Sequence, residues 1–233
     1  MGFASFFSTD SFIASCLLYR SCVTILSHAL RQVSQEVAAL PKLTREFYNR
    51  DTLDVARDLL GKYLVRRLDG MVLCGRIVET EAYVGRIDKA CHAYGYKRTR
   101  RTETLFAQPG TAYLYLIYGM YHCLNFVTEP EGEPCAVLLR GLECAGDGDA
   151  LARMRYGKPQ DELNAYQRRQ FLNGPGKVCQ ALGLTRAQNG LDLTGDELFL
   201  WDAGEPAPDC HTGPRIGIDY AQEAVEFPWR FWI

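Results

Sequence analysis

Two carboxylates in one short stretch are the first candidates for chemistry. Glu79 and Glu81 stand two residues apart in the segment VETEAY, which ends at Tyr83. Because side chains of a strand alternate between its faces, both carboxylates and Tyr83 fall on one face. A charged pair is costly in an apolar core, so that face meets solvent or a cleft. On spacing alone, a solvated strand face is the simpler interpretation, and general acid–base catalysis is the alternative.

Aromatic residues crowd a second segment, YLYLIYGMY, which runs from Tyr113 to Tyr121. Alternation puts Tyr113 and Tyr115 on one face, whereas Tyr118 and Tyr121 flank a Gly119-Met120 turn, for which we expect a type II′ hairpin. Core packing would explain aromatic residues in strands. Hairpin tips lie at the surface, however, and exposed aromatic or Met side chains can wedge between base pairs and hold a duplex bent.

The elements that carry these residues follow from the local patterns. Asp51 caps an expected helix over Thr52–Leu60, which ends at Gly61. The turn Asp69-Gly70 joins two strands, Tyr63–Leu68 and Met71–Tyr83. Further expected strands are Thr111–Tyr118, Tyr121–Val127, Cys135–Leu142, Leu198–Trp201, Arg215–Ile218 and Trp229–Ile233, and further helices are Leu151–Tyr156 and Gly176–Leu182.

Tight turns link most of these strands, and strict alternation of strands and helices is absent. The sequence therefore predicts an α+β fold: a single mixed domain with a curved, mainly antiparallel sheet, surrounding helices and a protruding hairpin. We expect this domain to span residues 43–233, with residues 1–42 as an N-terminal extension. That extension is poor in acidic residues, with Asp10 alone until Glu36. A transit peptide, a start codon assigned too far upstream, or a docked helix around Ile13–Ala38 would each explain it.

Together, the two segments resemble the alkyladenine (3-methyladenine) DNA glycosylase family, which also implies a sheet like that of the formyltransferase C-terminal domain. The likeness runs from about residue 43 to the C-terminus in several ordered motifs. The matching segments are Arg76–Tyr83, Ala90–His92, Pro109–Thr111, Tyr113–Asn125, Val137–Arg140, Gly174–Leu182 and Pro214–Ile218. The acidic loop Thr128–Pro134, which lies between Asn125 and Arg140, departs from the family pattern.

The resemblance implies a metal-free, cofactor-free hydrolase that flips alkylated or deaminated purines from duplex DNA and leaves an abasic site. Glu81 matches the family's general base, with Glu79 as its rival on the same face. Arg140 matches an arginine beside the attacking water, and the Ile216 carbonyl matches an acceptor that orients this water. The pocket for the base would consist of Tyr83, His92, Tyr115 and Asn125, although His92 would otherwise be interpreted as a core histidine.

The remaining roles concern the DNA itself. Tyr118 matches the side chain that fills the gap left by the flipped nucleotide, with Met120 and Tyr121 beside it. A packed hairpin tip is the alternative for all three. Candidate phosphate contacts are Lys97, Arg98, Arg100, Arg101, Lys177 and Arg215. A solvated loop explains the basic run 97–101 equally well, and Arg215 has a structural alternative.

The composition limits the other possibilities. Hydrophobic residues make up 47% and charged residues 23% of the 233 residues, with a net charge of −2. A protein that coats DNA is usually basic, so a DNA site here must be a local basic face. The nine cysteines are scattered without metal-ligand spacing, which favours reduced thiols in the cytoplasm. We expect a monomer that acts on double-stranded DNA, with no membrane span.

Two other functions fit the same residues. One is a catalytically silent DNA-lesion-binding protein of the same fold, against which the presence of both Glu81 and Arg140 argues. The other is a small-molecule hydrolase or formyl-transfer enzyme, for which an exposed Tyr118–Tyr121 tip would have no purpose.

Overall fold

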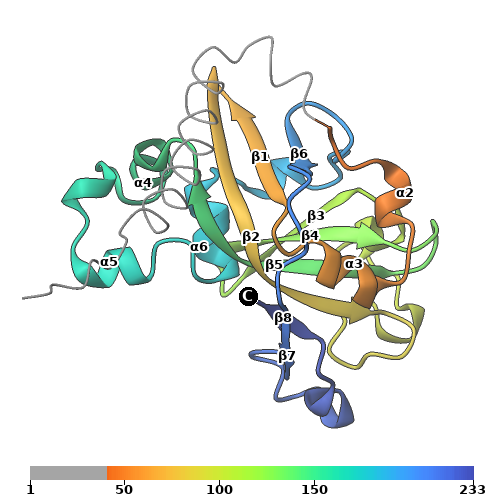
Figure 1. Ribbon diagram of the computed structural model, residues 1–233. Helices are drawn as coiled ribbons and strands as arrows, with labels where there is room; N and C mark the ends of the chain where they lie inside the picture. Colours follow the sequence, from red (N-terminus) through yellow and green to blue (C-terminus); the bar gives the residue numbers. More distant parts are fainter. Residues whose placement is uncertain (1–40) are drawn as a thin grey trace, which may run out of the picture.

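The computed structural model describes residues 41–233, and an antiparallel sheet forms the frame of this part of the chain (Figure 1). Its strands are β1 (Tyr63–Leu68), β2 (Met71–Val84), β3 (Ala112–Ile117), β4 (Tyr121–Thr128), β5 (Cys135–Ala145), β6 (Leu198–Trp201), β7 (His211–Gly213) and β8 (Arg230–Trp232). The order is β3-β4-β5-β2-β1-β6, and β8 pairs with both β2 and β7. This arrangement confirms the mixed α+β fold with an antiparallel sheet.

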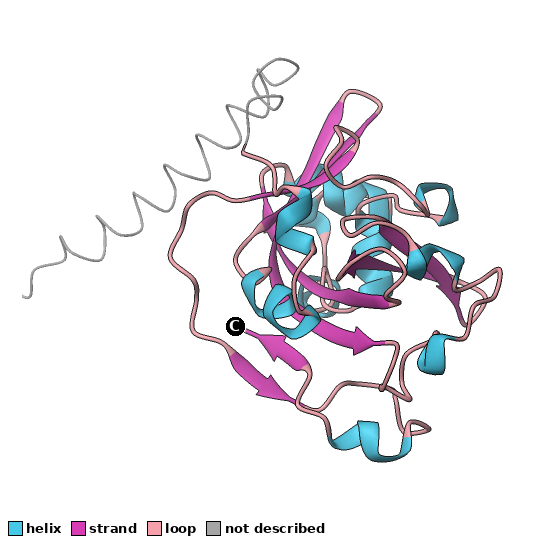
Figure 2. Ribbon diagram, turned by 90° about the vertical axis from the view of Figure 1, so that its right-hand side faces the viewer, coloured by secondary structure: helices cyan, strands magenta, loops and turns pink. Residues whose placement is uncertain are grey.

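Short helices surround the sheet, as Figure 2 shows. They are α2 (Arg45–Tyr48), α3 (Thr52–Asp58), α4 (Gly148–Tyr156), α5 (Ala165–Arg169) and α6 (Pro175–Ala181). The 3-10 helices are η2 (Tyr94–Tyr96), η3 (Glu103–Phe106), η4 (Gln160–Glu162), η5 (Arg186–Gln188) and η6 (Gln222–Glu226). Asp51 caps α3 as expected, because its Oδ1 accepts from the backbone N–H groups of Leu53 and Asp54.

The sheet has two different faces. One packs against α3, α4 and α6 and forms the main core, in which Leu124, Phe126 and Leu139 are at most 1% exposed. The other face carries a smaller cluster that includes Tyr113, Val127 and Ala136, with Tyr83 and Tyr115 packed against it. Alternation along each strand therefore places leucines on the core face and tyrosines on the opposite face. The tyrosine-bearing face is the one available for a site.

A bulge in β2 determines which of its residues reach that face. Leu73 and Ile77, at odd positions, pack in the main core, yet farther along the strand the core residue is Ala82, at an even position. The register with β5 shifts on both sides of Glu79, between Ile77 and Thr80. One extra residue in a strand moves the following side chains to the opposite face. Glu79, Glu81 and Tyr83 consequently share a face, as expected, and that face lies away from the main core.

Three local expectations need correction. The β3–β4 turn centres on Tyr118 and Gly119, both with positive φ (54° and 69°), and Met120 N–H donates to the Ile117 carbonyl. This pattern is that of a type I′ turn, not a type II′ turn at Gly119-Met120. The expected strand Arg215–Ile218 is a loop, and the strand in this region is β7. Strand β5 also continues to Ala145 instead of ending at Leu142, because it pairs along almost the whole of β2.

Candidate active site

Glu81 lies at the centre of the site, on the part of β2 that follows the bulge. Its side chain is 0% exposed. The Tyr83 hydroxyl donates to Oε2 at 2.8 Å, and the Ile216 N–H donates to Oε1 at 2.8 Å. The Arg140 Nε atom lies 3.4 Å from the same Oε1. These three contacts leave one of the four lone-pair positions of the carboxylate for a further donor, such as a water molecule.

Burial and hydrogen bonding act on Glu81 in opposite directions. Burial raises the pKa of the carboxyl group above its ordinary value of 4.5. The Arg140 charge, the Ile216 N–H and the Tyr83 hydroxyl each favour the ionised form and oppose this rise in pKa. A carboxylate with a raised pKa is a stronger base than one in water, provided that it stays ionised at working pH.

Glu79 occupies a different position from Glu81. Its Oε1 accepts from Arg140 Nε at 3.1 Å and from Arg230 Nε at 2.6 Å, and its side chain is 13% exposed. Glu79 therefore sits between two arginines, one on β5 and one on β8. Arg140 contacts both carboxylates, so it links Glu79, the alternative base, to Glu81, the preferred base. The geometry thus joins Glu79 to the arginine that also contacts Glu81.

A large pocket opens on the tyrosine-bearing face of the sheet, with a volume of about 970 Å³. All four residues expected to form the base pocket line it, namely Tyr83, His92, Tyr115 and Asn125, and so does Ile216. Arg140 lines it too, whereas the Glu81 carboxylate lies behind Tyr83, Arg140 and Ile216, which are its own bonding partners. The structure thus brings the predicted base and the predicted pocket together from four separate segments.

Aromatic contacts and hydrogen bonds fix the pocket walls. The His92 ring meets the Tyr115 ring edge-on at 4.6 Å between centroids, and its Nδ1 lies 3.2 Å from the Tyr113 hydroxyl. Burial, followed by the nearby Arg101 charge, lowers the pKa of His92 to about 4. Asn125 is 5% exposed, and its side-chain N–H donates to the Tyr113 carbonyl at 3.1 Å. The pocket therefore offers neutral, preorganised polar groups among aromatic rings.

The hairpin tip stands at the pocket mouth. Tyr118 is 80% exposed and Met120 is 64% exposed. Tyr118 and Tyr121 line the pocket, whereas Met120 lies outside it. The half-buried Tyr121 packs on the start of α6, where a Cβ added to Gly176 would come within 2.9 Å of the Tyr121 Cβ. Tyr118 thus projects freely, on a tip that α6 supports.

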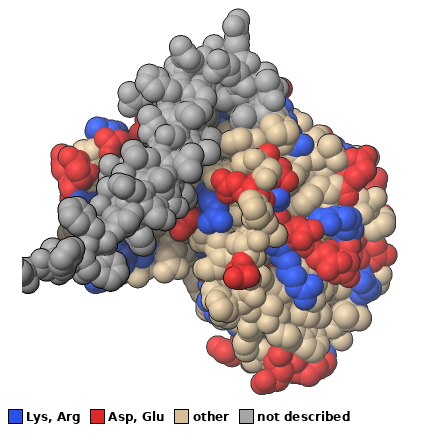
Figure 3. All heavy atoms as spheres, viewed as in Figure 1, with Lys and Arg blue, Asp and Glu red and all other residues tan. Residues whose placement is uncertain are grey.

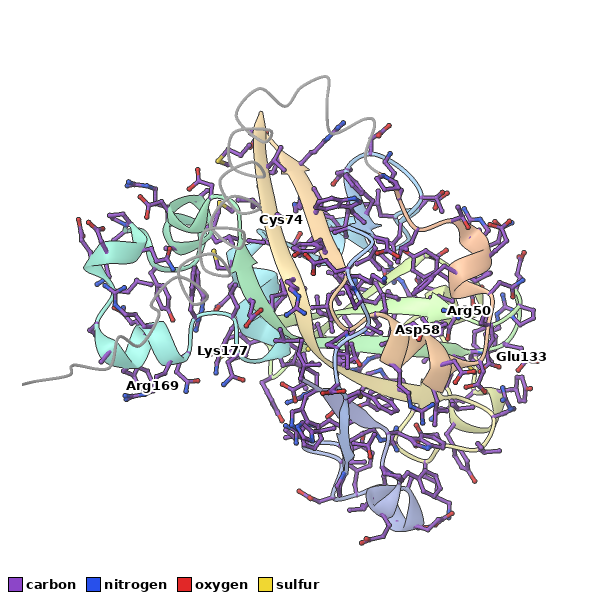
Figure 4. The ribbon with its side chains drawn as sticks, viewed as in Figure 1. Arg50, Asp58, Cys74, Glu133, Arg169 and Lys177 are labelled. Atoms are coloured by element: carbon purple, nitrogen blue, oxygen red, sulfur yellow. The ribbon has the colours of Figure 1, made fainter. Side chains whose placement is uncertain are left out.

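The predicted phosphate contacts divide into three groups. The basic loop side chains Lys97, Arg98, Arg100 and Arg101 are all exposed. Lys177 lines the far end of the pocket, on the α5–α6 side of the molecule where Arg169 also lies (Figure 4), and its Nζ contacts the Gln170 side chain.

Arg215 requires a correction. Its side chain is 0% exposed and forms two hydrogen bonds with Asp88, at 2.5 and 2.8 Å. The guanidinium also lies over the rings of Tyr83 and Trp229, at 4.7 and 5.1 Å. The guanidinium is buried and both of its Nη atoms donate to Asp88, so it cannot reach a phosphate and Arg215 is structural. The Asp88–Arg215 pair fixes the loop that presents the Ile216 N–H to Glu81.

Sequence reasoning missed Asp88, Arg230 and Tyr220. Asp88 and Arg230 act through long-range pairs, with Arg215 and Glu79 respectively, and no local pattern marks them. Tyr220 lines the pocket beside Ala90, and its hydroxyl donates to that residue's carbonyl at 3.3 Å. Its position two residues after the Pro214–Ile218 motif was the one available signal.

The described part of the chain holds no group of three or more His, Cys, Asp or Glu side chains that could bind a metal ion. Its seven cysteines, which include Cys74, Cys91 and Cys123, are free thiols. Among residues 41–233, no helix has both the length and the apolar character needed to cross a membrane.

Comparison with known proteins assigns the family. The model of the methylpurine-DNA glycosylase family matches residues 46–233. A protein named "Putative 3-methyladenine DNA glycosylase" from Clostridium perfringens (strain SM101 / Type A) is 51% identical over 195 residues, which cover 82% of this chain and 95% of that relative. A protein of the same name from Alkaliphilus oremlandii (strain OhILAs) is 50% identical over 192 residues, with the same coverage of 82% and 95%. The chain therefore belongs to the methylpurine-DNA glycosylase family and is a DNA N-glycosylase, a hydrolase of N-glycosidic bonds in DNA.

Proposed function

We propose that this glycosylase flips a damaged purine out of duplex DNA and hydrolyses its glycosidic bond with a water molecule that Glu81 activates. The observation that carries the proposal is the Glu81 carboxylate, fully buried and held by Arg140, Tyr83 and the Ile216 N–H directly behind the pocket. A buried carboxylate with spare acceptor capacity at a pocket wall is suited to bind and deprotonate water.

The reaction follows the general course of glycoside hydrolysis. The water oxygen forms a bond to the anomeric carbon while the bond from that carbon to the purine nitrogen breaks, and the bonding electrons leave with the base. Glu81 takes the proton of the water, and its negative charge stabilises the oxocarbenium-like transition state. Arg140 stays paired with Glu79 and holds the carboxylate and water in position. The product is an abasic site, and no lysine acts as a nucleophile, so the DNA strand stays intact.

The pocket suits alkylated and deaminated purines. Methylation at N3 or N7 gives a purine a positive charge, and a cation on an aromatic face gains about 0.5–2 kcal/mol. Tyr83, Tyr115 and His92 offer such faces. Asn125, fixed by the Tyr113 carbonyl, is positioned to disfavour the exocyclic amine of normal guanine. The names of the relatives point to 3-methyladenine as one substrate.

The DNA would approach along the hairpin tip. Flipping a nucleotide costs a few kcal/mol, and least at a damaged pair. Tyr118, with Met120 and Tyr121 beside it, would fill the gap and offset part of that cost. Lys97, Arg98, Arg100 and Lys177 would contact phosphates on either side of the pocket. The enzyme would act as a monomer, because one chain supplies every group that this mechanism uses.

Release of free base from duplexes that each carry one lesion tests the proposal. The Glu81→Gln variant should lose at least about 100-fold in the single-turnover rate, the scale of general base catalysis. Glu79→Gln is the matched control, and its loss should be smaller because that carboxylate only positions Arg140.

Unchanged release by Glu81→Gln would remove Glu81 from the mechanism, and a wild type that binds the lesion but releases no base would favour the silent lesion binder. A protein–DNA adduct trapped by borohydride would contradict the simple hydrolytic course.

A further inference from the structure

The Arg101 side chain contacts two residues that line the base pocket. Its guanidinium carbon lies over the Tyr115 ring, 5.3 Å from the ring centroid. Its Nη2 lies 3.3 Å from Nε2 of His92 and donates to it. Tyr115 and His92 both line the pocket. A cation that belongs to the protein therefore lies against two aromatic side chains of the pocket wall.

The contact between Arg101 and His92 determines which nitrogen of the histidine ring carries the proton. A guanidinium only donates hydrogen bonds, so Nε2 of His92 must be the acceptor and Nδ1 must carry the proton. That Nδ1–H faces the Tyr113 hydroxyl at 3.2 Å. Because burial and the Arg101 charge lower the pKa of His92 to about 4, the ring is neutral at physiological pH. The contact is thus compatible with the conditions under which the enzyme works.

The loop that carries Arg101 is built around a buried threonine. Thr102 is 3% exposed, and its hydroxyl donates to the Lys97 carbonyl at 2.9 Å while it accepts from the Thr99 N–H at 2.8 Å. Arg98 turns away from the pocket, where it pairs with Glu103 at 2.6 Å and lies over the Phe106 ring. Of the loop's cations, Arg101 is the one whose described contacts lie on the pocket wall.

We infer that Arg101 is a specificity-determining residue that sets the balance between cationic and neutral damaged bases. The inference rests on the proposed function. A base methylated at N7 that stacks on Tyr115 would lie near this guanidinium, and the two positive charges would repel each other. A neutral base such as hypoxanthine lets the guanidinium stay, and its N–H groups can donate to acceptors on the base. Arg101 therefore lowers the rate of release of cationic bases and preserves that of neutral bases.

The inference is tested by kcat/KM for release of 7-methylguanine and of hypoxanthine, each from the same duplex context at one salt concentration. Arg101→Gln keeps donors and removes the charge, and Arg100→Gln is the matched control one residue away. We expect Arg101→Gln to raise the ratio of 7-methylguanine to hypoxanthine release about threefold to tenfold over wild type. Arg100→Gln should leave that ratio within twofold. Nuclear magnetic resonance titration of His92 in the free enzyme should show a higher pKa in Arg101→Gln than in wild type.

The alternatives give distinct results. If Arg101 only contacts a phosphate, Arg101→Gln lowers both rates by the same factor, the ratio stays constant, and the inference is overturned. An unchanged His92 pKa would overturn the placement of the guanidinium itself. A wild type that releases neither base would contradict the proposed function, while the His92 titration would still report on Arg101.

Discussion

At the level of single residues, Glu81 combines full burial with three partners that favour its charge. Burial raises its pKa, so the folded protein binds the Glu81 proton more tightly than the unfolded chain does. The stabilisation that follows is fully present below the ordinary pKa of 4.5 and is lost as pH rises through the higher pKa of the folded state. The ionised form that the proposed mechanism needs is therefore the less stable one.

This reasoning predicts that Glu81→Gln, which resembles the protonated form, is more stable than wild type at pH 8, by about 1 kcal/mol as is common at active sites. The difference should shrink toward pH 4, where wild type also protonates. Urea denaturation at both pH values measures it. Glu79→Gln, which removes the negative charge between two arginines, should instead cost about 1–3 kcal/mol. A loss of stability in Glu81→Gln at pH 8 would mean that the charged partners outweigh burial.

At the level of elements, the β2 bulge is a feature that local sequence patterns do not predict. Alternation from Glu79 to Tyr83 was sufficient to place those side chains on one face. Alternation from Leu73 onward would have put them in the main core, and the bulge that prevents this arises from pairing with β5. The same limit applies to Arg215: its motif was recognisable, but its burial against Asp88 depends on a partner 127 residues away in the chain.

The β3–β4 turn puts a tyrosine in a conformation that favours glycine. Tyr118 has φ 54°, which is uncommon for a non-glycine residue. Tyr118→Gly should therefore leave stability unchanged or slightly raised, while base release from duplex DNA falls at least about tenfold because the wedge is lost. Release from single-stranded DNA should fall less. Asp69→Gly, which relieves a positive φ in the β1–β2 turn, is the control and should keep full activity. Equal release by Tyr118→Gly and wild type would contradict the wedge.

At the level of the whole molecule, the charge is nearly balanced. Acidic and basic side chains mingle over the described part of the face in Figure 3, in keeping with a net charge of −2. DNA binding must then depend on a few local cations. The sequence alone identified the basic loop but could not distinguish Arg98, which pairs with Glu103, from Arg101, which lies against the Tyr115 ring of the pocket wall. Those assignments depend on side-chain geometry that folding creates.

A local cationic site makes a prediction for salt dependence. Affinity for lesion duplexes should fall steeply with salt, and Lys177→Ala should reduce the slope of log K against log salt by about 1. Arg50→Ala should leave the slope unchanged, because Arg50 pairs with Asp58 beside α3, on the other side of the molecule from Lys177 (Figure 4). Fluorescence anisotropy over a salt series measures the slopes. A wild-type affinity that does not respond to salt would contradict a phosphate-binding face.

Strand β8 is synthesised long after β2, the strand with which it pairs. Its residues 230–232 are also made long after β3 and β4, and they pair directly with Glu79, Thr80 and Glu81. Arg230 also supplies one of the two arginines that hold Glu79. A nascent chain on the ribosome can form the β3–β4 hairpin and much of the pocket earlier, but its β2 then still lacks this partner strand. The β3–β4 hairpin and much of the pocket can therefore form before the sheet around Glu81 is complete.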